Sequence, residues 1–372
     1  MNSSAPHISS ETISINPSTV KWKEIISLGA LNAAIAISWI AYLEYQPALL
    51  DKFHLGHLYG WLVVAKALIL ICIPVLAGWI ADRNLILNGR FFTIYLVGIN
   101  ATAMIFMIVA TITGFGPESP VAFLLPAMVI CWLIGMALFL APAFSMLTWF
   151  ADKRRLPIAM GVIILLTDLI YALEPLVISL VRFLGETMTF VTGGILILGT
   201  GYLFYRLSAK DVFYRIQRTA HARSTRTEWG IVVSVALLVG LGRAFLVEYV
   251  PWQSPVGFMS GQEFSFLLLG LAAITAFLSS RIVIRTGIRK VINYAALIMG
   301  IGISVMLVGS ANEVMFTGGC LILAFGFALV NVAGLPYVFS RISARHTTFA
   351  VGVFLGGTAL AEGMMEILSF LL

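Results

Sequence analysis

Long apolar stretches separated by short polar turns make up most of the chain. A bilayer core about 30 Å thick needs roughly 20 residues of α-helix to cross it. Stretches of that length occur at 24–46, 58–80, 91–114, 121–149, 157–182, 187–206, 229–251, 263–284, 290–310, 314–340 and 348–371. The pattern therefore predicts an all-α polytopic membrane protein with eleven spans.

The composition supports that fold class. Hydrophobic residues make up 60% of the 372 residues and charged residues 11%, whereas about a quarter of an ordinary soluble domain is charged. So little charge argues against a soluble enzyme, a disordered chain and a nucleic-acid-binding domain. The residues before Lys21 are polar and rich in serine, so they are predicted to be a tail and not a signal peptide. The three cysteines lie in apolar runs and are expected to be small core residues: Cys72, Cys131 and Cys320.

The basic residues predict the orientation in the membrane. Of the 23 lysines and arginines, 19 fall on one side of the predicted spans, two (Lys52 and Arg182) fall on the other, and two (Lys66 and Arg243) lie inside spans. Short basic loops stay in the cytoplasm, so the N-terminus is predicted to be cytoplasmic, in a bacterial-type inner (plasma) membrane. The net charge of +6 thus reflects topology and indicates no nucleic-acid partner.

The longest cytoplasmic connection divides the spans into six and five. The predicted organisation is a tail at 1–23, a six-helix bundle at 24–206, a basic linker at 207–228 and a five-helix bundle at 229–372. The halves share a short repeat, because Glu44-Tyr45-Gln46-Pro47 ends the first span and Glu248-Tyr249-Val250-Pro251 ends the seventh, 204 residues later. Repeated halves are common in transporters.

The loop after the second span carries a motif. Its residues Gly78-Trp79-Ile80-Ala81-Asp82-Arg83, followed by Gly89-Arg90, resemble the G-x-x-x-D-R-x-G-R loop of the major facilitator superfamily, with four extra residues before Gly89. Gly78 permits close helix approach, Asp82 can cap the helix that follows, and Arg83 can pair with carboxylates or helix C-termini. The same residues suit a hairpin that fixes topology or a latch that holds one conformation.

The resemblance implies two pseudo-symmetric helical bundles around a central cavity. A complete member of the superfamily has twelve spans and a cytoplasmic C-terminus, so this chain looks one helix short. Either the sequence is truncated or the twelfth helix, which is peripheral in the family, is dispensable.

Ionisable residues within the predicted spans are the candidate functional groups. Each costs at least about 2.5–3.5 kcal/mol on insertion scales, so each needs a partner or a role. They are Glu44, Lys66, Asp168, Glu174, Arg243, Glu248, Glu362 and Glu366. Helical spacing places Tyr171 and Glu174 on one side of the fifth span with Asp168, and aligns Glu362 with Glu366 on the eleventh. Such stripes face protein or a water-filled cavity, because lipid cannot satisfy them.

Asp168 and Glu362 lie near mid-depth and are predicted to bind substrate or protons, with a buried structural pair as the alternative. Arg243 lies on a span that lines the cavity in the resembled family. Because a buried guanidinium needs a carboxylate, we expect Arg243 to meet Asp168 or an anionic group. Trp39 and Asn331 are weaker candidates for the same cavity; for Trp39, core packing is the favoured interpretation.

Lys66 has three candidate partners in two alternative arrangements. In the resembled family the second span faces the eleventh across the two halves, which implies a pair with Glu362 or Glu366 that breaks during transport. A static pair with Glu44 is equally consistent with the sequence.

The repeated Glu-Tyr pairs lie toward the outer ends of the first and seventh spans. Glu44, Tyr45, Glu248 and Tyr249 fit either simple snorkelling toward the interface or a symmetric outer gate where protons enter.

These residues predict a function without enzymatic chemistry, cofactor or metal. Carboxylates in a low-dielectric interior take up protons more readily than in water. We expect a secondary transporter that works by alternating access on a small-molecule substrate, with protons or another cation as the coupling ion and uptake as the direction. No Walker motif occurs, so ATP is not expected to drive transport. The alternatives are a proton-driven exporter of organic cations and a non-transporting receptor or assembly factor.

Overall fold

The computed structural model describes residues 20–371 except 119, 221–227, 255–256 and 258, and all regular structure in that part is helical. The first half contains α1 (Trp22–Lys52), α2 (Tyr59–Asn88), α3 (Phe92–Phe115), α4 (Leu125–Ser145), α5 (Leu147–Phe150), α6 (Leu156–Ala172) and α7 (Glu174–Ala220). The second contains α8 (Trp229–Ala244), the π-helical turn η3 (Phe245–Tyr249), α9 (Val250–Gln253), α10 (Gly261–Thr286), α11 (Ile288–Val308), α12 (Glu313–Arg341) and α13 (Thr347–Leu371). Short 3₁₀ turns are η1 (Gly56–Leu58), η2 (Ala122–Leu124) and η4 (Ala344–His346).

Local sequence explains several helix ends. Gly89 adopts a left-handed conformation (φ 63°) and ends α2, as glycine does without steric cost. A capping box begins α10, where the Glu263 N–H donates to Ser260 Oγ at 3.2 Å and the Ser260 N–H donates to Glu263 at 2.9 Å. Asn312 caps α12 through its side-chain oxygen. These local signals explain where α2 ends and where α10 and α12 begin.

Ten helices in the described part are long and apolar enough to cross a bilayer. The fifth predicted span is the exception, because its helix is broken. α6 ends at Ala172 after 17 residues, and α7 starts at Glu174. Pro175 explains the break, since proline lacks an N–H and disfavours helical geometry in the preceding residue. The prediction of one continuous helix over 157–182 is therefore wrong.

The ends of the predicted linker and tail are partly described. α7 bends at Gly185 (φ 74°) and continues to Ala220, so the linker predicted from residue 207 begins as helix. Residues 221–227 and 1–19 lie outside the described part of the chain.

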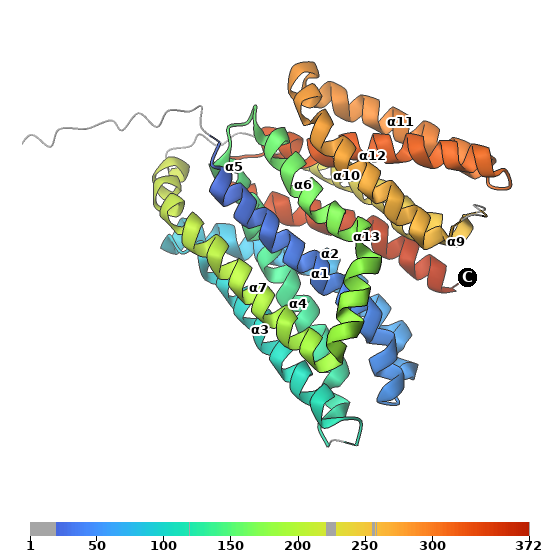
Figure 1. The fold of residues 1–372 in the computed structure, drawn as a ribbon. Helices are drawn as coiled ribbons and strands as arrows, with labels where there is room; N and C mark the ends of the chain where they lie inside the picture. The colour runs from blue at the N-terminus through green and yellow to red at the C-terminus, as the bar shows by residue number, and fades with distance from the viewer. Residues whose placement is uncertain (1–19, 119, 221–227, 255–256, 258, 372) are drawn as a thin grey trace, which may run out of the picture.

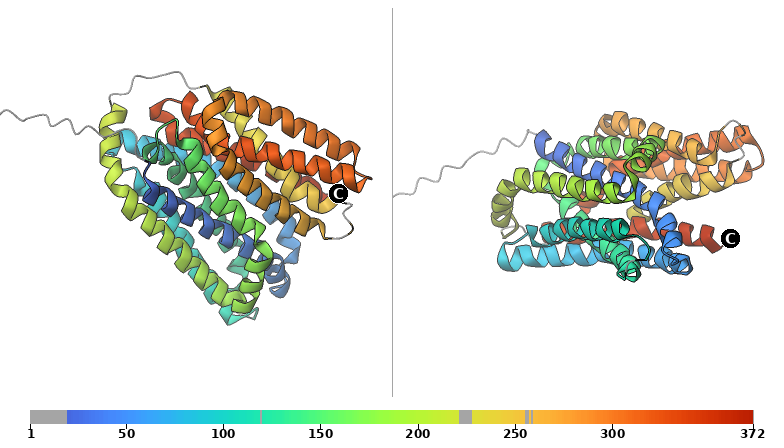
Figure 2. Two further views of the ribbon diagram at one scale, coloured as in Figure 1. Left: turned by 45° about the horizontal axis from the view of Figure 1, so that its top comes forward. Right: turned by 60° about the horizontal axis from the view of Figure 1, so that its bottom comes forward.

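Several helix pairs join the halves, and two of them are the most extensive. α2 runs along α13, and α6 runs along α10. Figure 1 shows α13 crossing behind the first half while α10, α11 and α12 lie beside one another. Figure 2 shows α11 and α12 side by side from two further directions. The α2–α13 contact needs glycine, because side-chain carbons at Gly78 and Gly352 would meet the partner helix backbone. These helices carry several of the charged residues described below, including Lys66 on α2 and Glu366 on α13.

The cysteines correct one expectation. Cys320 is buried, but Cys72 and Cys131 are exposed on the outside of the protein. In a membrane protein the lipid-facing side of a span is as apolar as its core side, so an apolar run does not distinguish the two.

Candidate functional site

Asp168 on α6 meets residues of the opposite half. Its Oδ1 lies 4.0 Å from Nη1 of Arg243 on α8, and its Oδ2 accepts a hydrogen bond from Nδ2 of Asn331 on α12 at 3.4 Å. The Asp168 carboxylate is buried, with 4% of the residue exposed. Both partners come from the second half of the chain, so this side chain links the two halves through charge and a hydrogen bond.

Arg243 has three neighbours. Besides Asp168, its Nε lies 3.4 Å from Oε1 of Glu362 on α13, and its guanidinium carbon lies 4.8 Å from the ring centroid of Tyr171. An arginine stays charged in any protein environment, and a charge at this depth is tolerated when carboxylates compensate it. The ring adds a cation–π contact. The expected meeting of Arg243 with Asp168 is thus present in the structure.

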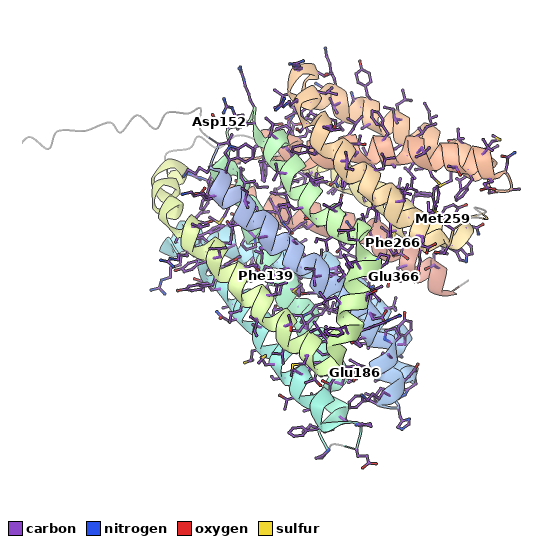
Figure 3. The ribbon with its side chains drawn as sticks, in the orientation of Figure 1. Phe139, Asp152, Glu186, Met259, Phe266 and Glu366 are labelled. Atoms are coloured by element: carbon purple, nitrogen blue, oxygen red, sulfur yellow. The ribbon has the colours of Figure 1, made fainter. Side chains whose placement is uncertain are left out.

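Lys66 forms the second ion pair between the halves. Its Nζ pairs with Oε1 of Glu366, and the lysine is 9% exposed. Figure 3 labels Glu366 near the end of α13. Glu44 instead pairs with Arg182, whose Nε lies 2.6 Å from Oε1 of the glutamate. Of the two expected arrangements, the structure therefore contains the pair that crosses from α2 to α13.

Glu174 lies apart from this cluster. The sequence places it on one helical stripe with Asp168, but the break after Ala172 separates the two residues. Its charged neighbour is Glu44, with which it interacts electrostatically. The predicted stripe from Asp168 to Glu174 therefore crosses the break between α6 and α7.

The two repeated Glu-Tyr pairs have different surroundings. Tyr45 donates its hydroxyl to the Val181 carbonyl at 2.9 Å, inside the first half. Tyr249 lies in the π-helical turn η3, with its ring 5.4 Å from that of Phe245. The first copy lies in a continuous α-helix and the second in a π-turn, so the equivalent sequence positions do not form equivalent structures.

The motif residues Gly78 to Arg83, expected in a loop, lie inside α2, which continues to Asn88, and Asp82 contacts α13. The Asp82 carboxylate accepts the N–H groups of Thr348 at 3.2 Å and Phe349 at 2.8 Å, both in the first turn of α13. The expectation that Asp82 caps the helix following its own loop is wrong, because α13 lies against α2 and presents its free N–H groups there.

The remaining motif residues have local roles. Arg83 lies with its guanidinium carbon 5.3 Å from the centroid of the Trp79 ring, while the Arg90 N–H donates to the Asn84 carbonyl at 3.3 Å. Gly89 supplies the turn that ends α2.

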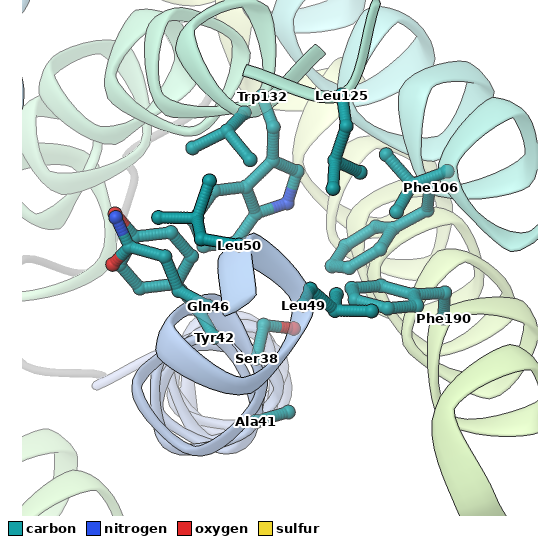
Figure 4. A pocket seen from close by; sticks show the side chains of 12 residues that line it. Ser38, Ala41, Tyr42, Gln46, Leu49, Leu50, Phe106, Leu125, Trp132 and Phe190 are labelled. Atoms are coloured by element: carbon teal, nitrogen blue, oxygen red, sulfur yellow. The ribbon is translucent and has the colours of Figure 1, made fainter. Parts of the chain in front are cut away.

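The sequence reasoning missed Tyr42 and Gln46. They border an apolar cavity of about 40 Å³ enclosed by α1, α3, α4 and α7, shown in Figure 4. Trp39, Tyr42 and Trp132 pack ring against ring, with centroids 5.0–5.5 Å apart. Within the described part of the chain, Tyr42 Oη and Gln46 Nε2 are buried without a hydrogen-bond partner. Ser38, Tyr42 and Gln46 recur every four residues on α1, a polar spacing by which the sequence signals this face.

Comparisons with known proteins reveal similarity only at the level of structure. No model of a known protein family matches the sequence, and no curated protein matches it. The crystal structure of the human organic anion transporter MFSD10 (TETRAN) aligns with a TM-score of 0.65 at 15% identity, over 94% of this chain and 92% of that one. The proton:xylose symporter XylE of the major facilitator superfamily, bound to 6-bromo-6-deoxy-D-glucose, aligns with a TM-score of 0.65 at 14% identity, over 94% and 88%.

The chain has the major facilitator superfamily fold. The resemblance inferred from the motif loop is therefore confirmed for the architecture, and so is the all-α membrane fold class. Within this fold the Asp168–Arg243–Glu362 cluster and the Lys66–Glu366 pair both connect the two halves.

Proposed function

We propose that this chain is a secondary active transporter that moves a small polar solute by alternating access, coupled to protons and in the direction of uptake. The observation that carries the proposal is the ion-pair cluster between the halves, in which Asp168 of one half contacts Arg243 of the other and Lys66 contacts Glu366. A structural protein gains nothing from charges placed this deep, because each is costly in a membrane.

Alternating access explains why these ion pairs lie between the two halves. In transporters of this kind one half rocks against the other around a central site. The Asp168–Arg243 and Lys66–Glu366 contacts must break when α6 separates from α8 and α2 from α13. The solute or a proton then replaces the lost partner of each charge. Binding at the site is thereby coupled to the arrangement of the halves.

Protons are the proposed coupling ion because carboxylates outnumber cations in the cluster. Lys66 and Arg243 face Asp168, Glu362, Glu366 and the nearby Glu248. Surplus carboxylates in a low-dielectric environment favour proton uptake. Uptake is the proposed direction because the fifth span lacks the Gly-Pro-rich motif that the resemblance associates with drug antiporters.

The test is solute-dependent proton movement in proteoliposomes with an imposed pH gradient. We expect Asp168→Asn and Glu362→Gln each to reduce that movement to background, because each removes a titratable carboxylate of the cluster. The matched control is Glu228→Gln, whose carboxylate pairs with Arg341 at 3.3 Å outside the cluster. It is expected to transport like the parent.

Three other outcomes would contradict the proposal in different ways. Unchanged proton movement in both variants would show that the site lies elsewhere. Resistance of a sensitive host to toxic organic cations, without uptake, would indicate an exporter. No transport across a broad solute panel would favour the non-transporting alternative.

A further inference from the structure

Asn100 is a polar residue on the exposed side of α3. This helix packs against α4 and α7, and Figure 1 shows it at the edge of the first half. α3 is one of the helices that are long and apolar enough to cross a bilayer, and the side chain of Asn100 is exposed on it. At 1.5 Å per residue, Asn100 lies about 5 Å from the middle of the 24-residue helix. Its carboxamide therefore faces hydrocarbon near the centre of the membrane.

The Asn100 carboxamide is only partly satisfied by its own helix. Its Nδ2 donates to the Leu96 carbonyl at 2.8 Å, and it makes no other hydrogen bond among the described residues. By contrast, the exposed Thr111 satisfies its single donor on the Met107 carbonyl at 2.8 Å. A carboxamide has two N–H donors and a carbonyl oxygen. Asn100 thus keeps a donor and an acceptor that lipid cannot satisfy, which is costly.

Exposed residues recur along α3 at alternating spacings of four and three positions. We call this set the α3 seam: Thr93, Val97, Asn100, Met104, Met107 and Thr111. Residues at this spacing lie along one side of a helix, and pairs of membrane helices that meet along such a seam cross at about +20°. A shallow hollow lies on the same side, lined by Thr93, Leu96, Val97, Asn100, Ala101 and Met104. The seam therefore offers a second helix both a concave surface and a polar group.

A second copy of this chain supplies a matching polar group at the same depth. All copies have the same orientation in the membrane, because the distribution of basic residues sets it. A two-fold axis along the membrane normal then places α3 of two copies side by side and parallel, so that each Asn100 faces its equivalent. A carboxamide complements itself, since the N–H of one group donates to the carbonyl oxygen of the other. α3 contains no charged residue that would repel its copy.

We propose that this chain forms a homodimer in the membrane through the α3 seam, with the Asn100 carboxamides of the two protomers hydrogen-bonded to each other at the two-fold axis. A single asparagine in an otherwise apolar helix interface fixes the register and the number of helices, at some cost in stability. This inference is independent of the proposed transport. The most extensive contacts between the halves involve α2, α6, α10 and α13, and α3 packs within the first half.

Cysteine cross-linking tests the position of the interface. In a background lacking Cys72, Cys131 and Cys320, Met104→Cys places a thiol on the seam and leaves Asn100 unchanged. Leu297→Cys on α11 is the matched control, because Leu297 is 64% exposed and Met104 60%, and both lie near the middle of their helices. After oxidation of the purified full-length chain in proteoliposomes, we expect a dimer band on a non-reducing gel for Met104→Cys and none for Leu297→Cys.

Variants of Asn100 test the hydrogen bond. The dimer dissociation constant is measured by single-molecule photobleaching of fluorescently labelled protein over a range of protein-to-lipid ratios. Asn100→Leu is expected to raise that constant about three- to thirtyfold, the effect of losing an interhelical hydrogen bond in a membrane. Asn100→Gln keeps the carboxamide and is expected to retain most of the affinity. The control Asn293→Leu changes an exposed asparagine of α11 and is expected to dimerise like the parent.

Three results would overturn the inference. The first is a purified chain that stays monomeric at every protein-to-lipid ratio. The second is a dimer whose dissociation constant is the same in the parent and in Asn100→Leu, because the interface then lies elsewhere. The third is cross-linking of Leu297→Cys as efficient as that of Met104→Cys, because random collisions in the bilayer would then account for both.

Discussion

Arg243 contacts carboxylates from both halves of the chain. Its two acidic partners are Asp168 on α6 and Glu362 on α13, and the Tyr171 ring lies against its guanidinium. The planar, permanently charged guanidinium suits several partners at once in a way that lysine does not. Removing it leaves two carboxylates without their cation.

Replacement of this arginine tests how much the cluster contributes to stability. Arg243→Ala is expected to lower the free energy of unfolding by about 3–5 kcal/mol, because it strands charge inside the protein. Thermal denaturation in detergent measures the effect as a lower Tm. The control is Arg182→Ala, since the Arg182 side chain is 68% exposed and pairs with Glu44 at the surface. Its Tm is expected to stay close to that of the parent, because exposed ion pairs contribute little to stability. Equal losses in the two variants would contradict the role given to Arg243.

At the residue scale the sequence indicates which groups matter, and it predicts the Arg243–Asp168 contact but leaves the partner of Lys66 open. Asp168, Arg243 and Glu362 stand out because an ionisable residue within a span is costly. The choice of Glu366 over Glu44 for Lys66 depends on which helix lies beside α2. The sequence does not single out Tyr42, because tyrosine is common in apolar spans. Only the structure shows that its hydroxyl is buried without a partner among the described residues.

At the element scale, the hydrophobic pattern predicts the spans. It does not predict the break between α6 and α7 or the π-helical turn η3. The break between α6 and α7 has a local cause in Pro175, which the sequence contains. The π-helical turn that carries Glu248 has no such signal, because the Glu-Tyr-x-Pro pattern that it shares with the first span lies there in a regular α-helix. Packing against neighbouring helices therefore decides the difference.

Close packing of α2 on α13 gives a prediction at this scale. A side-chain carbon at Gly352 would meet the backbone of Pro74 and Val75, so Gly352→Ala forces the helices apart. We expect a loss of about 1–3 kcal/mol, as for other overpacked interiors. Gly300→Ala on α11 is the matched control, because nothing lies within 4 Å of its added carbon. Thermal unfolding of both variants checks the difference, and equal Tm values would contradict it.

At the scale of the whole molecule, the motif residue Asp82 joins the halves. Asp82 accepts two backbone N–H groups from the first turn of α13, and the Thr348 hydroxyl lies 3.2 Å from that of Ser145 on α4. A carboxylate at a helix N-terminus is stabilised by the free N–H groups and the helix dipole. In this conformation these hydrogen bonds therefore hold α2 and α4 of the first half against the first turn of α13.

Locking that contact tests alternating access. The variant Ser145→Cys with Thr348→Cys, in a background lacking Cys72, Cys131 and Cys320, is expected to form a disulfide on oxidation. If the halves must separate here, transport in proteoliposomes falls to background when oxidised and returns with reductant. Each single-cysteine variant serves as the control. Full transport by the oxidised double variant would show that this contact stays closed throughout the cycle.

The sequence by itself determines the membrane fold class, the approximate spans and the few ionisable residues at membrane depth, because these follow from local hydropathy and the cost of charge in lipid. Tertiary structure decides the partners. Lys66 and Glu366 are 300 residues apart in sequence, and Asp82 caps a helix more than 260 residues away. Such pairings depend on which helices pack together, and the polarity of a single helix does not specify its neighbour.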